Sequence, residues 1–204
     1  MIFLLSGEGP TDLGTTENGC FVPGPLCLLL DQLCGNKTVE KVYISKNELA
    51  EIELRKGEGN IRARGIKNVG RNRYFHRNAY ALGKKAVQES KVHGSVVAIL
   101  FRDSDGTHSS PSRQYQDKLD SIKNGFHDAQ CEYGVAMLAK PTSEAWLLCA
   151  LKNQYQGCAR LEELPGNRES DRHPKKCWLR CSRIAQVQKN FANWFSRESW
   201  MATG

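Results

Sequence analysis

Two apolar runs that each end in a short acidic turn constrain the fold of this chain most strongly. Residues 1–5 form the first run, and Glu8 follows it closely; residues 96–101 form the second, with Asp103 and Asp105 just beyond. Continuous apolar runs of this kind are typical of strands covered on both faces of a parallel sheet. Because the carboxyl ends of parallel strands share one crevice, we expect these three carboxylates to lie close together there.

Helical patterns alternate with apolar strands along the chain, which indicates an α/β fold. Strands are predicted at residues 1–5, 39–44, 96–101 and 133–138, and helices at Pro25–Leu33 and at residues 48–55, 74–90, 110–129 and 142–152. The expected architecture is a doubly wound, mostly parallel sheet flanked by helices, because right-handed crossovers place all the strand-end loops on one edge.

The segments between these elements are predicted from their glycine and polar content. Residues 15–24 are expected to be irregular, and residues 56–73 to form a loop. A polar loop is expected at residues 165–176, and a closing helix between residues 177 and 200 is left open. These features indicate an α/β domain at residues 1–155 that carries a basic loop-helix insertion, followed by a tail at residues 156–204.

Length and composition describe an ordinary globular protein. The chain has 204 residues and a net charge of +7, with 40% hydrophobic and 25% charged residues. No apolar run is long enough to cross a membrane, and the first residues lack the basic start of a signal peptide. We therefore expect a cytoplasmic protein with no membrane partner, in which the eight cysteines are reduced thiols. The spacing of His173, Cys177 and Cys181 is only a weak indication of zinc.

The carboxylates favour a divalent metal site. Mg²⁺ and Mn²⁺ prefer hard carboxylate oxygens, and such ions can neutralise phosphate charge and activate a nucleophile. Asp and Gly are also ordinary turn residues, so each acidic motif alone fits a purely structural turn equally well. It is the pair of motifs, each at the end of a buried strand, that favours metal binding and phosphoryl chemistry.

The same motifs resemble a Toprim domain, the catalytic module of topoisomerases, bacterial primases and OLD-type nucleases. Residues 8–12 read Glu-Gly-Pro-Thr-Asp and residues 103–105 read Asp-Ser-Asp. The Toprim family has a glutamate after its first strand and an Asp-x-Asp after its third. The first motif is most similar to the OLD-like and small stand-alone Toprim nucleases, and the resemblance covers about residues 1–150.

The resemblance implies a metal site and assigns its residues. Glu8, Asp103 and Asp105 would be the catalytic residues that hold Mg²⁺ or Mn²⁺, with Glu8 also able to move a proton. Asp12 would be a further ligand, and Glu144 would complete a second metal site.

Two of the residues near this edge have ordinary alternatives. Glu144 fits equally well as an exposed acid in the first turn of a helix, favoured there by the helix dipole. Lys140 would neutralise a substrate phosphate, although a surface lysine is the commoner role for such a residue.

A basic segment at residues 55–85 predicts nucleic-acid binding. It carries ten Lys and Arg residues against the single acid Glu58, and glycines make it pliable. Arginine forks and aromatic rings supply the phosphate neutralisation and base stacking that a polynucleotide requires, whereas a solvated basic loop is the plain alternative. The residues assigned to nucleic-acid contact are Arg62, Arg64, Lys67, Arg71, Arg73, His76, Arg77 and Lys140.

These observations predict a Mg²⁺- or Mn²⁺-dependent endonuclease or nickase that acts on DNA or RNA. The resemblance implies a separate ATPase subunit as partner and a role in antiviral defence. One alternative is a haloacid-dehalogenase-type phosphatase, since residues 103–107 read Asp-Ser-Asp-Gly-Thr and Asp103 would then be the nucleophile. That motif normally opens its fold, whereas about a hundred residues precede it here. A non-catalytic subunit that binds nucleic acid or an ATPase is the other alternative.

Overall fold

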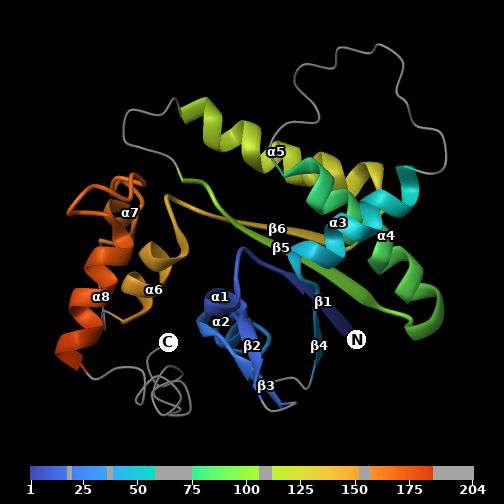
Figure 1. The fold of residues 1–204 in the computed structure, drawn as a ribbon, viewed down its shortest axis with the longest axis horizontal. Helices are drawn as coiled ribbons and strands as arrows, with labels where there is room; N and C mark the ends of the chain where they lie inside the picture. The colour runs from blue at the N-terminus through green and yellow to red at the C-terminus, as the bar shows by residue number, and fades with distance from the viewer. Residues whose placement is uncertain (18–19, 36–38, 58–74, 106–111, 152–156, 186–204) are drawn as a thin grey trace. The chain divides into compact units, whose positions relative to one another are not determined.

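The computed structural model describes residues 1–17, 20–35, 39–57, 75–105, 112–151 and 157–185 (Figure 1). The chain forms two compact units. The sheet unit contains residues 1–104 and 109–139, and the helical unit contains residues 105–108 and 140–204. The boundary at Lys140 precedes the one expected at residue 156, and Asp105 belongs to the second unit although its sequence neighbour Ser104 belongs to the first.

A four-stranded, all-parallel sheet forms the centre of the sheet unit. Its strand order is β4-β1-β5-β6, where the strands are β1 (Ile2–Ser6), β4 (Glu40–Tyr43), β5 (Val96–Asp103) and β6 (Gly134–Ala139). The four predicted strands are confirmed, and β5 extends two residues further than its apolar run. The α/β class is confirmed as well.

Five helices belong to the described part of the sheet unit: α1 (Pro10–Leu13), α2 (Pro25–Leu33), α3 (Lys46–Gly57), α4 (His76–His93) and α5 (Ser112–Asp128). Helices α3, α4 and α5 lie on one side of the sheet, and α1 and α2 lie on the other (Figure 1). The helices expected around α2 to α5 are confirmed with small changes at their ends, whereas the short helix α1 was not predicted.

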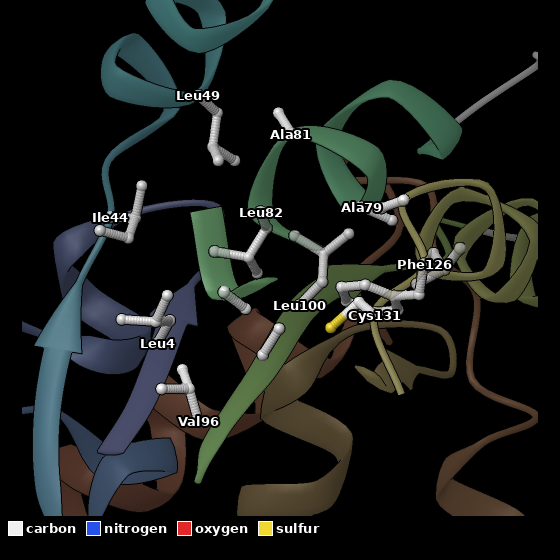
Figure 2. Close-up of a cluster of buried hydrophobic side chains, with 14 of the residues drawn as sticks. Leu4, Ile44, Leu49, Ala79, Ala81, Leu82, Val96, Leu100, Phe126 and Cys131 are labelled. Atoms are coloured by element: carbon white, nitrogen blue, oxygen red, sulfur yellow. The ribbon is translucent and has the colours of Figure 1, made fainter. Parts of the chain in front are cut away.

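The main hydrophobic core lies between the sheet and helices α3, α4 and α5. Leu4 and Leu100 contribute from β1 and β5, and Leu82 and Ile122 from the helices, each 1% exposed or less. Figure 2 shows Leu4, Leu82 and Leu100 side by side in this cluster. Burying apolar surface on both faces of β1 and β5 explains why these strands read as continuous apolar runs.

Local interactions fix the ends of two helices near the sheet. Ser45 and Glu48 form a capping box at the start of α3: the Ser45 N–H donates to Glu48 Oε2 at 2.7 Å, and the Glu48 N–H donates to Ser45 Oγ at 3.2 Å. At the start of α4, the buried His76 Nε2 lies 2.9 Å from Asp128 Oδ2 at the end of α5. These contacts hold α3 at the end of β4 and α4 against α5.

The segment expected to be irregular at residues 15–24 contains an antiparallel hairpin instead. Strand β2 (Gly14–Glu17) pairs with β3 (Cys20–Pro23), with Thr15 opposite Val22 and Thr16 opposite Phe21. β-branched and aromatic residues favour strands. The intervening Asn18-Gly19 dipeptide is the strongest short-range signal for a hairpin turn, so the expectation was wrong although the signal was present in the sequence.

The helical unit contains α6 (Ser143–Leu151), α7 (Cys158–Leu161) and α8 (Pro174–Ala185). The first of these was expected; α8 begins inside the predicted polar loop at residues 165–176, and α7 was not predicted. Ala145, Leu148 and Leu161 form a small core against which Trp178 packs. The tail beyond residue 185 lies outside the described residues.

Cys149 and Cys158 form a disulfide, with their Cα atoms 5.3 Å apart. The expectation that all eight cysteines are reduced thiols is therefore wrong for this pair. The two residues lie at the end of α6 and the start of α7, and the contact between these helices brings them together. Cys177 is a free, half-buried thiol beside the same core. No helix among the described residues has the length and apolar character needed to span a membrane.

Candidate metal centre at the carboxyl edge of the sheet

The two acidic motifs meet at the carboxyl ends of β1 and β5. These strands are direct neighbours, with Ser6 opposite Leu100 in the parallel register. Just beyond that pair, the Asp103 backbone N–H donates a hydrogen bond to Glu8 Oε1 at 3.4 Å, a long and therefore weak bond. Both residues are half-buried. Glu8 and Asp103, which are 95 positions apart, thus meet at this edge, and the contact is made by the Asp103 backbone and not by its carboxylate.

Helix α1 places Asp12 close to this edge. Its N–H donates to the Gly9 carbonyl at 3.3 Å, which closes the turn that carries Glu8. Gly24 lies against the end of this helix, and a Cβ there would lie 2.5 Å from the Asp12 carbonyl oxygen and 2.7 Å from the Gly14 nitrogen. Only glycine permits so close an approach of two backbone segments. The position of Asp12 is therefore set by backbone packing.

Tyr43, at the end of β4, lies near several charged groups of this edge. Burial raises the pKa of Tyr43 above its ordinary value. The Arg102 guanidinium opposes that shift, whereas the carboxylates of Asp12 and Glu48 increase it. Tyr43 therefore lies within electrostatic range of all three charged groups, and the ends of β4, β1 and β5 share one polar environment.

Arg102 is the residue of this edge that sequence reasoning missed. Its side chain is 1% exposed, and burial lowers its pKa, while Glu8 and then Tyr43 raise it. In the sequence Arg102 stands directly between the apolar run and Asp103. A charged residue inside a strand that is otherwise apolar was the signal that could have identified it, because charges are almost never fully buried without a purpose or a partner.

Asp105, Lys140 and Glu144 belong to the helical unit. Asp105 is exposed and has a φ of +46°, in the left-handed region, and its N–H donates to the Pro141 carbonyl at 2.9 Å. Glu144 is half-exposed in the first turn of α6, the position that the alternative of a helix-dipole acid describes, and Lys140 is exposed. The structure thus divides the predicted site residues between the two units.

Within the helical unit, Asp105 and Glu144 both act on the buried His173. Burial lowers the pKa of the His173 imidazole; Glu144 opposes this shift, and Asp105 opposes it less strongly. Its Nδ1 accepts a hydrogen bond from the Lys175 N–H at 3.1 Å. His173 therefore belongs to the polar surroundings of these two carboxylates, a position that its weak zinc spacing did not indicate.

The pKa of His173 predicts how stability depends on pH. As pH falls below the ordinary histidine range, the unfolded chain takes up a proton that the folded chain binds less readily, so the free energy of unfolding decreases by up to about 1.4 kcal/mol per pH unit. We expect denaturant titrations between about pH 5 and pH 8 to show this loss, and the variant His173→Asn to show a smaller one. The variant His127→Asn, at a side chain that is 86% exposed, is the control and should keep the wild-type slope. Equal slopes in wild type and His173→Asn would contradict the prediction.

The metal-ligand set is only partly assembled. Among the described residues, no three His, Cys, Asp or Glu side chains are gathered closely enough to hold a metal ion. The pair of Glu8 and Asp103 is nevertheless the donor set that Mg²⁺ commonly uses, since this ion is bound by one or two carboxylates with waters and substrate phosphates completing its shell. Glu8 and Asp103 are therefore the candidate donors for such an ion, and no third ligand lies close beside them in the part of the chain that the structure describes.

The basic segment is described only at its end. Arg62, Arg64, Lys67, Arg71 and Arg73 lie outside the described residues. Arg77 is exposed in the first turn of α4, as nucleic-acid contact requires. His76 is 8% exposed, bonded to Asp128 and stacked on Tyr80, so the expected use of its ring as an exposed stacking surface is wrong.

Searches with this chain against protein-family models, curated proteins and solved structures found no match.

Proposed function

We propose that this protein is a Mg²⁺- or Mn²⁺-dependent nuclease of Toprim type that hydrolyses phosphodiester bonds in DNA or RNA. The observation that carries the proposal is the hydrogen bond from the Asp103 N–H to Glu8 Oε1 across neighbouring parallel strands. An isolated acidic turn needs no second acidic motif beside it, so the meeting of the two motifs favours a shared ligand over two independent turns.

A divalent ion bound at this pair would neutralise phosphate charge and supply an activated nucleophile at neutral pH. The chain contributes the rest. Glu8, just beyond β1, and Asp103, at the end of β5, would hold the ion, and the half-exposed Glu8 carboxylate would accept or return a proton at the same edge. Asp12 approaches this edge from α1 and would be a further ligand of the ion.

The proposed substrate is a polynucleotide. The exposed Arg77 continues the basic run of the sequence into α4, and a basic surface next to a phosphoryl-transfer site suits a phosphodiester backbone. A separate ATPase subunit and a role in antiviral defence follow from the resemblance to OLD-like nucleases, and they form part of the same proposal.

The proposal is tested by incubating the purified protein with supercoiled plasmid and with structured RNA in Mg²⁺, Mn²⁺, Ca²⁺ or EDTA, alone and with an ATPase encoded beside it. We expect nicked or linear plasmid, or shortened RNA, in Mg²⁺ or Mn²⁺ and none in EDTA, because the carboxylates have no catalytic power of their own without the ion. Intact substrate under every condition, or cleavage that persists in EDTA, would overturn the proposal.

A further inference from the structure

Helix α8 has one side that packs inside the helical unit. It lies beside α6 (Figure 1). Cys177 and Trp178 pack against the small core of the unit, and Pro174 is buried as well. These positions share one side of the helix, because residues three and four apart lie on the same face. The apolar side of α8 is therefore covered by the protein itself.

The outward face of α8 is basic. At the same helical spacing it carries four side chains: Lys175, Lys176, Leu179 and Arg180. Three of the four are exposed, and the Lys176 side chain is 39% exposed. Among the described residues, the ion pair of this face is the one from Lys176 to Asp171, at 3.6 Å. The sequence of α8 contains no acid, so most of this positive charge is not compensated within the helix.

The turn before α8 adds no net charge to this face. Arg168 and Arg172 are exposed there, and the exposed acids Glu169 and Asp171 match them in number. The excess of positive charge is therefore a property of the helix and not of the whole segment.

The first turn of α8 carries its charges against the preference of an isolated helix. A helix N-terminus has a partial positive charge, so carboxylates stabilise the first turn and cations destabilise it. The first turn of α8 contains no acid and carries Lys175 and Lys176. Stability alone does not explain this arrangement, whereas a negatively charged partner would be attracted both by the lysines and by the helix dipole.

Duplex DNA suits this face better than other polyanions. A helix that binds a membrane surface buries a broad apolar face in the lipid, but only Leu179 is a large apolar side chain on the outward face. Single strands are held by stacking on aromatic rings, and the four outward positions contain none. They also contain no hydroxyl or amide side chain to recognise the 2′-hydroxyl groups that distinguish RNA. A DNA duplex needs only cations that neutralise its dense row of phosphates.

We propose that the outward face of α8, formed by Lys175, Lys176 and Arg180 around Leu179, is a docking surface for the phosphate backbone of duplex DNA. This inference rests on the proposed function for its choice of partner, and it adds a binding surface that lies within the helical unit. The three cations span about 7.5 Å along the helix, a length over which duplex DNA presents several phosphates. Contacts of this kind position a protein on DNA and read no sequence.

The test removes the three charges together in the α8 triple variant, Lys175→Gln with Lys176→Gln and Arg180→Gln. Binding of a fluorescein-labelled DNA duplex is followed by anisotropy in EDTA, so that metal-dependent cleavage does not consume the duplex. We expect the affinity near physiological salt to fall by about 10- to 100-fold. The slope of log affinity against log salt concentration should become shallower by about 2 to 3, because each phosphate contact contributes about 0.9.

A matched control removes three exposed lysines of the sheet unit, in the variant Lys46→Gln with Lys91→Gln and Lys123→Gln. It lowers the net charge of +7 by the same amount and should keep a salt slope close to that of wild type. An unchanged salt slope in the α8 triple variant, or an equal loss in the control, would overturn the inference. A loss that depends on α8 only with an RNA duplex of the same sequence, or only in co-sedimentation with phosphatidylserine vesicles, would contradict it as well.

Binding and cleavage separate the two proposals. Metal-dependent cleavage combined with duplex binding that does not depend on α8 rejects this inference alone. Duplex binding that depends on α8, without cleavage under any condition, rejects the proposed function alone.

Thermal melts distinguish a docking face from a structural one. Because Lys175 and Lys176 oppose the helix dipole, removing their charges should leave the melting temperature unchanged or raise it while binding weakens. Should the α8 triple variant melt well below wild type, Arg180→Gln alone replaces it. A salt slope that does not then become shallower by about 1 would rule out the docking surface.

Discussion

The variants Glu8→Gln and Asp103→Asn are each expected to reduce metal-dependent cleavage by at least about 100-fold in kcat, the size of effect seen when a residue essential for proton transfer or metal binding is removed. Each change replaces a carboxylate by an amide of nearly the same shape, so the fold is preserved while a charged ligand is lost. The Asp103 N–H that donates to Glu8 is unchanged in Asp103→Asn. Single-turnover cleavage of a labelled duplex or RNA, with the variants at equal concentration, measures the loss.

The double variant provides a sharper criterion than either single change. The effects of residues that act on one ion are strongly non-additive. The kcat of the double variant should therefore be only slightly lower than that of the less active single variant. Glu132→Gln is the matched control, because Glu132 is exposed and precedes β6 at the opposite edge of the sheet. Full cleavage in both single variants would reject this site. A covalent phosphate trapped on Asp103 would instead support the phosphatase alternative.

Gly125→Ala is expected to destabilise the protein by about 2 to 3 kcal/mol, the upper range for overpacking a well-packed interior. A Cβ at this position would lie 2.4 Å from the His76 carbonyl oxygen and 2.7 Å from the Ala79 Cβ, so α4 and α5 would have to separate. The sign is opposite to that of intrinsic helix propensity, which favours Ala over Gly by about 1 kcal/mol. Urea denaturation, read as the free energy of unfolding in water, measures the effect.

The control for Gly125→Ala is Lys123→Ala, at an exposed position of the same helix, where the free energy of unfolding should change by no more than about 0.5 kcal/mol. A Gly125→Ala variant as stable as wild type would show that α4 and α5 do not approach each other this closely. The same result would also contradict the bond between His76 and Asp128, because that bond requires the same close packing of α4 and α5.

The parallel sheet could be predicted from the sequence because strands that are buried on both faces consist of continuous apolar residues. The apolar runs at β1 and β5 contain no polar residue that would permit another assignment, and the acidic turns follow at once. The meeting of Glu8 and Asp103 followed from topology alone, since neighbouring parallel strands end at one edge. These expectations needed no knowledge of side-chain packing.

Other features depend on contacts that the sequence does not record. The burial of His76 follows from the approach of α4 to α5 at Gly125, which periodicity does not reveal. The disulfide between Cys149 and Cys158 depends on how α6 and α7 pack, and eight cysteines allow many pairings. The burial of Arg102 is established only by the structure, although its place directly after an apolar run was a signal in the sequence.

The pairing of β1 with β5 has a consequence for how errors in this sheet would be detected. Successive side chains of a strand point to opposite faces, so a slip of one residue would exchange the faces occupied by Arg102 and Asp103 and move the amide that Glu8 accepts. A chain misaligned by a single position would still bury much of its apolar surface, but it would lose the contact between the Glu8 carboxylate and the Asp103 amide. If the proposed nuclease activity is found, its loss in a protein that still melts cooperatively would therefore reveal such a misalignment.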